Sequence, residues 1–272
     1  MYLTRYRPVP PLDEFVEFLW CLSDGPTHSR ERILPAGTTE LVINLGADHI
    51  EVMRSRESVR RFSGAVVSGP YTHSFDIDAS KHAAMLGVHF KPVGAQALLG
   101  IPPADLRDSH VDLEQLWDVG VDRLRARVCE ATTPAERFRL VESALSSRLR
   151  LDLAPRPVIA HSVGALQAGA FHPPIGELAD RAGMSHRQFI KDFTATVGLT
   201  PKVFGRIRRF HRAVGRIGSA APPRWAQFAV ECGYSDQGHM IREFQHFSGF
   251  TPVQYLSHTH VATKDDHVAI AA

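Results

Sequence analysis

Two short segments in the C-terminal third of the chain carry side chains able to hydrogen-bond to the edges of nucleic-acid bases. Arg187 and Lys191 lie in the first segment, and Gln237, His239 and Arg242 lie in the second. These residue types suit the donors and acceptors of the DNA major groove, although histidine has no strongly preferred base partner. Exposed polar residues on a helix are more often only solvated. A reading role therefore depends on the elements that position them.

Both segments belong to a pattern that occurs twice. The first copy contains Ile175, Leu178, Ala179, Ala182, Gly183, Met184, Ser185, Phe193, Gly198, Leu199, Thr200 and Pro201, and the second contains Trp225, Phe228, Ala229, Cys232, Gly233, Tyr234, Ser235, Phe244, Gly249, Phe250, Thr251 and Pro252. The offset is 50 residues up to the serine and 51 beyond it, so the second copy has one added residue. The chain thus holds two structural units of one kind in tandem.

Each copy predicts a helix, a tight turn and a second helix. Apolar residues at positions i, i+3, i+4 and i+7 give the first helix one buried stripe. Gly183 and Gly233 follow where a positive φ is wanted, and Ser185 and Ser235 stand two residues later as N-caps. The second helices are predicted at about 185–196 and 235–247, with a polar face turned outward. A helix of this kind is the one that helix-turn-helix motifs insert in the major groove.

The basic excess belongs to the half of the chain that holds the two copies. Residues 155–272 contain 13 Lys and Arg against 8 Asp and Glu, whereas residues 1–154 contain 18 against 21. The segment between the copies predicts a connecting helix with an apolar stripe and six basic residues, namely Lys202, Arg206, Arg208, Arg209, Arg212 and Arg216. Arginines on this helix are expected to reach phosphates, which gives affinity and register without sequence information.

The segment from about Ile175 to Tyr255 resembles the DNA-binding domain of the AraC/XylS family of bacterial transcription regulators, including the stretches "CGYSDQGHMIREF" and "FSGFTPVQY". The resemblance implies that each unit offers one recognition helix to successive major-groove segments. The base-reading residues are then expected to be Arg187, Ile190, Lys191, Gln237, Gly238, His239 and Arg242, and the phosphate-contacting residues Ser185, Ser235, Arg206, Arg208 and Arg209. Ile190 could touch only a thymine methyl group, and Gly238 offers no side chain.

The N-terminal half has a different character. Residues 1 to about 90 predict mostly strands, which favours a barrel or sandwich, and helices follow from Pro92. The clearest helix has Thr133 as N-cap, Pro134 at its first position and Glu136 completing a capping box. The predicted fold class is multidomain α+β, with a β-rich domain and following helices at 1–150, a linker at 151–160, an all-α double helix-turn-helix domain at 161–258 and a flexible tail at 259–272. In the AraC/XylS layout, such a cupin-like N-terminal domain senses a small molecule or dimerises.

The β-rich domain gives weak signs of chemistry. Its histidines at positions 28, 49, 73, 82, 89 and 110 form no His-x-His pair followed by a carboxylate, so they are interpreted as scattered surface residues. Glu40, on an apolar strand, is interpreted as an outward, solvated side chain, with a ligand contact inside the barrel as the alternative. Cys21 has apolar neighbours, which suggests an inert thiol, and Cys232 stands where the first copy has a small core residue. No metal, cofactor or enzymatic activity is predicted.

The 272 residues, 44% of them hydrophobic, suffice for two cores, and the sequence has no 18-residue apolar run and no leader. Three cysteines without paired spacing agree with a reducing compartment. We therefore expect a cytoplasmic, sequence-specific transcription regulator that binds double-stranded DNA and no membrane. RNA polymerase, a small-molecule effector and a homodimer are left open as partners. The alternatives are a DNA-binding module fused to an enzymatic or metal-binding β-barrel, an architectural DNA binder, and a scaffold that does not touch DNA.

Overall fold

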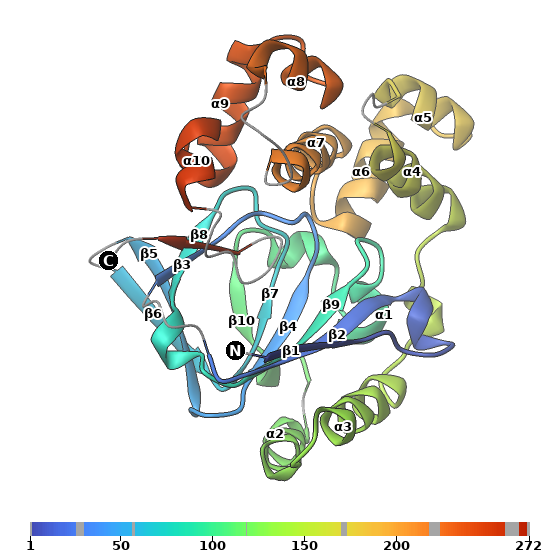
Figure 1. Ribbon diagram of the computed structural model, residues 1–272. Helices are drawn as coiled ribbons and strands as arrows, with labels where there is room; N and C mark the ends of the chain where they lie inside the picture. The colour runs from blue at the N-terminus through green and yellow to red at the C-terminus, as the bar shows by residue number, and fades with distance from the viewer. Residues whose placement is uncertain are drawn as a thin grey trace.

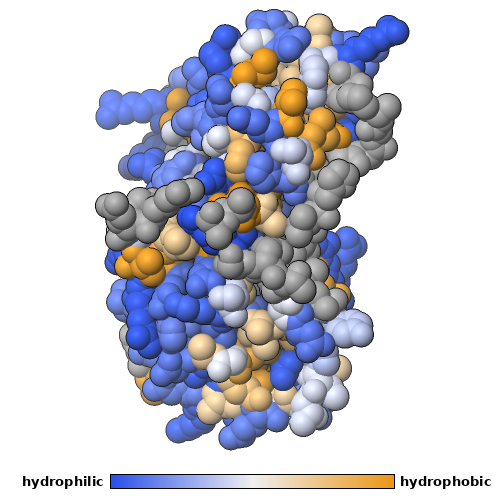
Figure 2. All heavy atoms as spheres, turned by 60° about the vertical axis from the view of Figure 1, so that its left-hand side comes forward, coloured by the Kyte–Doolittle hydropathy of each residue, from blue (hydrophilic) through white to orange (hydrophobic). Residues whose placement is uncertain are grey.

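The computed structural model of the protein describes residues 2–25, 30–55, 58–117, 119–169, 173–217, 224–258 and 267–270. A β-rich half carries the helical C-terminal half on one side, and α2 (Val121–Glu130) and α3 (Pro134–Ser146) lie at its opposite end (Figure 1). On the face drawn in Figure 2, hydrophobic residues form small, separate groups among hydrophilic ones. No helix in these ranges combines the length and the apolarity needed to span a bilayer.

The β-rich half consists of two antiparallel sheets. One sheet has the order β1–β2–β9–β4–β7–β10, with bounds Tyr2–Tyr6, Val16–Ser23, Met85–Phe90, Glu40–Asn44, Ala65–Ser68 and His110–Asp112. The other has the order β11–β3–β8–β5–β6, with bounds His267–Ile270, Arg30–Ile33, Phe75–Asp78, His49–Ser55 and Ser58–Ser63. The predicted β-rich barrel or sandwich is therefore confirmed.

Helices and short 3-10 turns, with the buried turn residues Leu12, Leu106 and Leu113, pack on the outer face of the first sheet, whereas the turn at Ala79–Lys81 lies beside β3 of the other sheet. The helices are α1 (Ala95–Leu99), α2 (Val121–Glu130) and α3 (Pro134–Ser146), and the turns are η1 (Leu12–Glu14), η2 (Ala79–Lys81), η3 (Pro103–Leu106), η4 (Leu113–Gln115) and η5 (Leu151–Leu153). The capping box predicted for α3 is present, since the Thr133 hydroxyl accepts a hydrogen bond from the Glu136 amide and the Glu136 carboxylate accepts one from the Thr133 amide. The apolar stripe of α3 packs inside the chain.

Alternation along the strands gives this sheet two apolar faces. Leu41 and Ile43 of β4 pack into the core that α1, α2 and α3 cover, whereas Val42 between them points into the space between the two sheets. Gly87 of β9 faces that space too, and a Cβ atom there would lie 2.2 Å from the Trp20 ring. Glycine at this position makes room for the indole.

The C-terminal half is helical, as predicted. It contains α4 (Pro157–Ala168), α5 (Ile175–Arg181), α6 (His186–Val197), α7 (Pro201–Ile217), α8 (Trp225–Glu231), α9 (Gln237–Ser248) and α10 (Pro252–His258). The connecting helix α7 runs through its core and buries Phe204, Ile207 and Phe210. Helix α4 begins inside the segment predicted as a linker at 151–160, because Pro157 occupies its first turn, where a missing amide hydrogen is harmless.

The predicted flexible tail at 259–272 is wrong for residues 267–270. These residues form β11, which pairs antiparallel with β3 so that His267 lies opposite Ile33 and Ile270 opposite Arg30. The rest of that tail, at 259–266 and 271–272, lies outside the described residues. The C-terminal strand therefore completes the edge of an N-terminal sheet (Figure 1).

The two halves are in direct contact. Leu34, which follows β3, is buried in the core of the helical half. The ring of His211 on α7 lies 2.7 Å from the carbonyl oxygen of Pro35. Gly198, the C-cap of α6, lies against Pro70 and Pro103 of the β-rich half. The C-terminal end of α6 and the helix α7 thus contact the β-rich half.

Replacing Gly198 by alanine should destabilise the protein more than the same change at Gly183. Both glycines have positive φ, +83° and +64°, so each substitution costs about 1–2 kcal/mol of left-handed backbone strain. A Cβ at Gly198 would also lie 2.3 Å from Pro70 Cγ and 2.8 Å from Pro103 O, whereas a Cβ at Gly183 meets open space among the described atoms. Overpacking should add about 1–3 kcal/mol at Gly198 alone. Urea unfolding of both variants measures the difference, and equal losses would contradict the close approach.

Candidate nucleic-acid interface and ligand pocket

The first recognition helix, α6, presents an exposed polar face. Ser185 is its N-cap, as predicted, and its hydroxyl accepts a hydrogen bond from the Gln188 amide at 3.2 Å. Phe189 and Phe193 are buried on the opposite face. Arg187 and Lys191 are exposed on the outward face, whereas Ile190 and the nearby Asp192 are half-buried, and Asp192 is held by Arg156 at 2.9 Å.

The second recognition helix, α9, begins one residue later than predicted. Its N-cap is Asp236, not Ser235, because the residue added in the second copy brings the Asp236 carboxylate within 2.7 Å of the His239 amide. The Ser235 hydroxyl instead donates to Asp236 at 2.9 Å. Gln237 and Arg242 are exposed, and Gly238 is half-buried.

His239 is folded back toward its own helix. Its Nδ1 lies 3.0 Å from the Ser235 hydroxyl, and its Nε2 lies 3.5 Å from Oε1 of Glu243. The ring also meets Tyr234 edge-on. A base-reading role for His239 requires its ring to turn outward, and it stays a prediction, as do the roles of the six other residues named for base reading.

The arginines of α7 are engaged within the protein. The Arg206 Nε donates to Glu243 at 2.7 Å, and one Arg209 nitrogen donates to both Glu243 oxygens at 3.1 Å. Arg208 is half-buried near Arg212 and Glu17, and burial lowers the pKa of its guanidinium group. Phosphate contacts by Arg206 and Arg209 therefore remain predictions that their ion pairs with Glu243 do not favour, and the contact expected for Arg208 remains a prediction that its burial does not favour.

Glu243 was not singled out from the sequence. It is only 4% exposed and joins the connecting helix to the second recognition helix. In the sequence, Glu243 lies among polar residues of the predicted outward face, where an acidic side chain is normally solvated. Its position therefore gave no indication that it is buried. Only the packing of α7 against α9 shows that Glu243 points inward.

Glu243→Gln should destabilise the protein far more than Glu231→Ala. Neutralising Glu243 leaves Arg206 and Arg209 without their carboxylate partner in a largely buried position. The loss in free energy of unfolding should be about 3 kcal/mol, which is the low end of the range for a broken buried ion pair, because Arg206 is partly exposed. Glu231 pairs with Arg216 on the surface, where a lost ion pair costs about 0–1 kcal/mol. Thermal unfolding of the two variants is the measurement. Similar losses would show that the buried pair is no stronger than the surface one.

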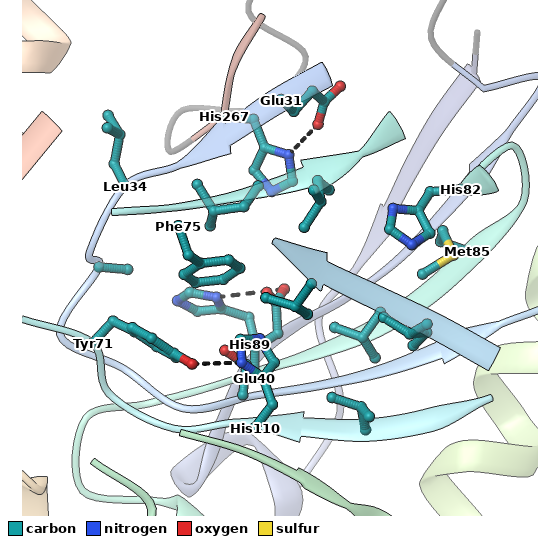
Figure 3. Close-up of a pocket in the computed structure, with 18 of the residues that line it drawn as sticks. Glu31, Leu34, Glu40, Tyr71, Phe75, His82, Met85, His89, His110 and His267 are labelled. Atoms are coloured by element: carbon teal, nitrogen blue, oxygen red, sulfur yellow. Dashed lines mark hydrogen bonds and ion pairs between the residues drawn. The ribbon is translucent and has the colours of Figure 1, made fainter. Parts of the chain in front are cut away.

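A large pocket lies between the two sheets of the β-rich half (Figure 3). Its empty space, with the open mouth included, is about 1030 Å³. Most of its lining is apolar and comes from both sheets, for example Val42 and Val66 on one and Ile33, Val52 and Ile77 on the other.

Polar side chains enter the pocket as pairs. The Glu31 carboxylate lies 2.6 Å from Nδ1 of His267, across the β3–β11 pair. The Trp20 indole donates to Glu40 at 2.6 Å. The Tyr71 hydroxyl lies 2.5 Å from Nδ1 of His110. Figure 3 shows Glu31, Glu40, His110 and His267 on different strands around the pocket, and Tyr71 on the segment that follows β7.

Two interpretations of the β-rich sequence are therefore wrong. Glu40 points into the pocket rather than outward, because it shares a strand face with Val42 and lies opposite to Leu41. His82, His89 and His110 also line the pocket, whereas His49 and His73 lie at the surface. His28 lies outside the described residues. Both faces of the first sheet are apolar, so alternation could not tell inside from outside.

His82 is the one pocket histidine whose ring nitrogens are both buried without a hydrogen-bond partner among the described residues. Its side chain is 5% exposed, and burial lowers the pKa of its imidazole to about 4. The ring is therefore neutral at pH 7, with one donor and one acceptor available inside an apolar space. Among the described residues, no group of three or more His, Cys, Asp or Glu could hold a metal ion.

His82 should make the fold less stable in mild acid. The folded pKa of about 4 lies below the ordinary 6.5, so the unfolded chain binds the proton first as pH falls. Stability should drop by about 3 kcal/mol between about pH 6.5 and pH 4 because of this group. His82→Leu should remove that part of the pH dependence, and His246→Gln, at an exposed position, should not. Unfolding midpoints measured across this pH range decide the matter, and parallel curves for all three proteins would be the contrary result.

Two family descriptions match the chain. The C-terminal residues 178–258 match the family described as "Helix-turn-helix domain", and residues 4–112 match a "Domain of unknown function (DUF6597)". No curated protein matches the chain in sequence.

Several solved structures are similar. The DNA-binding domain of AdpA, described as a global transcriptional factor and solved with a target DNA, is 23% identical and covers 38% of this chain and 92% of its own, with a TM-score of 0.35. A probable AraC family transcriptional regulator from Rhodopseudomonas palustris CGA009 is 25% identical over 38% of this chain and 96% of its own, with a TM-score of 0.34. ToxT from Vibrio cholerae O395 is 7% identical over 88% of this chain and 95% of its own, with a TM-score of 0.46.

Proposed function

We propose that this chain, a DNA-binding transcription regulator of the AraC type, reads an asymmetric DNA site with its two helix-turn-helix units while its β-rich domain, of unknown function, senses a small molecule. The observation that carries the proposal is the exposure of two unlike polar faces on one repeated scaffold. Arg187 and Lys191 are exposed on α6, and Gln237 and Arg242 are exposed on α9.

The unlike faces favour a site without two-fold symmetry. The N-cap of each recognition helix fixes the alignment, so Arg187 corresponds to Gly238 and Lys191 corresponds to Arg242. The first unit offers a cation in its first turn and another one turn later, whereas the second keeps only the later one. One polypeptide then reads two different half-sites in successive major-groove segments.

Phosphate contacts are expected to differ between the units as well. The N-terminus of α6 combines backbone amides with the neutral Ser185 cap, which suits a phosphate oxygen. The Asp236 carboxylate already occupies the N-terminus of α9, and its charge repels a phosphate. We therefore propose a phosphate contact for Ser185 and give up the one expected for Ser235.

The pocket supports sensing by the β-rich domain. Its lining is largely apolar with a few converging polar groups, which is the usual composition of ligand sites. Glu31, Glu40 and His82 supply acceptors, and the neutral His82 ring can also donate. We propose a mainly apolar ligand with at least one hydrogen-bonding group.

Selection of binding sites from random DNA with the purified full chain tests DNA reading directly. A recovered site with two unlike half-sites supports the proposal. Recovery of no preferred sequence, or of a palindrome, contradicts it.

Arg187→Ala and Arg242→Ala should each damage a different half of the selected site. Loss of a base-reading arginine should cost about 1–3 kcal/mol of discrimination at its own base pairs and leave the other half-site unchanged. Fluorescence anisotropy with duplexes mutated in one half at a time measures this. The two variants serve as controls for each other, and a uniform loss for all duplexes would show that these arginines do not read bases.

A further inference from the structure

Strands β3 and β11 lie between the pocket and the helical half, and successive residues on them face opposite sides. On the inner side, Glu31 of β3 and His267 of β11 line the pocket and are paired at 2.6 Å. The two residues are diagonal neighbours in the antiparallel register, since His267 lies opposite Ile33 and Glu31 opposite Ala269. Glu31 is 4% exposed, so this pair is a buried part of the pocket wall.

On the outer side, the same strands hold the second helix-turn-helix unit. Arg32 forms an ion pair with Asp76 of β8 at 2.7 Å, and it donates to the carbonyl oxygen of Ser248, the last residue of α9, at 3.1 Å. Its guanidinium also lies 4.9 Å from the centre of the Phe250 ring. A cation at this place matches the negative end of the α9 dipole.

Val268 of β11 adds an apolar contact on that outer side. It is fully buried in the core of the helical half, and Ile270 packs partly buried against the same core. Strand β11 follows the DNA-binding helices in the sequence, yet it pairs with a strand of the N-terminal domain (Figure 1). It therefore touches the pocket with one face and the DNA-binding half with the other.

We infer that β11 and β3 form a latch, that is, a pair of strands that couples the pocket to the second helix-turn-helix unit. A ligand opens this latch when it binds the Glu31 carboxylate and breaks its contact with His267. The inference rests on the proposed function, because it names how the sensing site regulates DNA reading. The ligand that does so carries a hydrogen-bond donor or a positive charge that binds the Glu31 carboxylate, on a body that fits the apolar lining.

The closed latch favours binding of the complete DNA site. With the C-terminal end of α9 fixed against the β-rich half, the second unit keeps its orientation relative to α6, which rests on the same half at Gly198. When the latch opens, the second unit is no longer held in a fixed orientation relative to the first. Binding both half-sites at once then costs the conformational entropy of ordering the second unit, which lowers the affinity. The first unit has its own contacts and is unaffected.

Two truncated chains test the latch without any ligand. A chain ending at residue 266 lacks β11, and a chain ending at Ile270 keeps it and serves as the matched control. Hydrogen exchange is expected to rise at the C-terminal end of α9 and in α10 only when β11 is absent, while α6 keeps its protection. Unchanged exchange in α9 and α10 overturns the inference, whether or not the protein binds DNA.

DNA binding provides the second measurement, and His267→Ala provides a variant that keeps the strand. With the duplex recovered by selection from random DNA, the chain ending at 266 and the His267→Ala variant should both lose about tenfold in affinity relative to the chain ending at Ile270. A duplex with the second half-site scrambled should bind all three proteins equally. An unchanged or higher affinity for the full site, or an equal loss on the scrambled duplex, overturns the latch. Failure of every protein to bind any duplex contradicts the proposed function instead, and the exchange data still decide on the latch.

Discussion

The alternation of side chains along β3 is the constraint on which the arrangement of the two halves depends. A strand sends successive residues to opposite faces, so Glu31 lines the pocket while Arg32 next to it reaches the end of α9. A shift of one residue in the β3 register would exchange these faces and place an arginine in the apolar pocket. The ion pair between Arg32 and Asp76, and the pairing of β3 with both β8 and β11, fix that register. The pocket and the C-terminal end of α9 therefore lie on opposite faces of β3.

Inside the helical half, a buried carboxylate has the corresponding role. Glu243 on α9 receives hydrogen bonds from Arg206 and Arg209 on α7, and the desolvated charges hold these two helices in one relative position. Phe210 of α7 packs edge-on against Phe244 beside this pair, with the ring centres 5.0 Å apart. Because α7 also contacts the β-rich half through His211, its position links three parts of the molecule. Arg206 and Arg209 of the connecting helix thus fix the position of α9 in addition to contributing positive charge.

The sequence predicted those parts of the fold that rest on local patterns. The two helix-turn-helix units, the capping box at Thr133 and the α7 stripe each follow from residues within about one or two helical turns of each other, where spacing is informative. The pocket and the Glu31–His267 contact were missed because they depend on distant pairings and on sheets with two apolar faces. His267 and Glu31 are 236 residues apart, and nothing near either residue indicates the other. Glu40 was misplaced for the second reason, since Val42 and Leu41 are equally apolar on opposite faces of its strand.

The inserted residue in the second copy changes what the two units can offer to DNA. It makes Asp236 the cap of α9, so that the first turn of this helix begins with a carboxylate and continues through the side-chain-free Gly238. In α6 the corresponding positions are the neutral Ser185 and the cationic Arg187. The leading cation of α9 is therefore Arg242, four residues beyond Gly238 and about 6 Å further along the helix axis at 1.5 Å per residue. Helix-turn-helix proteins read bases mainly with the N-terminal part of the recognition helix. Under the proposed function, the two units therefore approach their base pairs differently. A single inserted residue thus gives two copies of one scaffold recognition helices with unlike exposed faces.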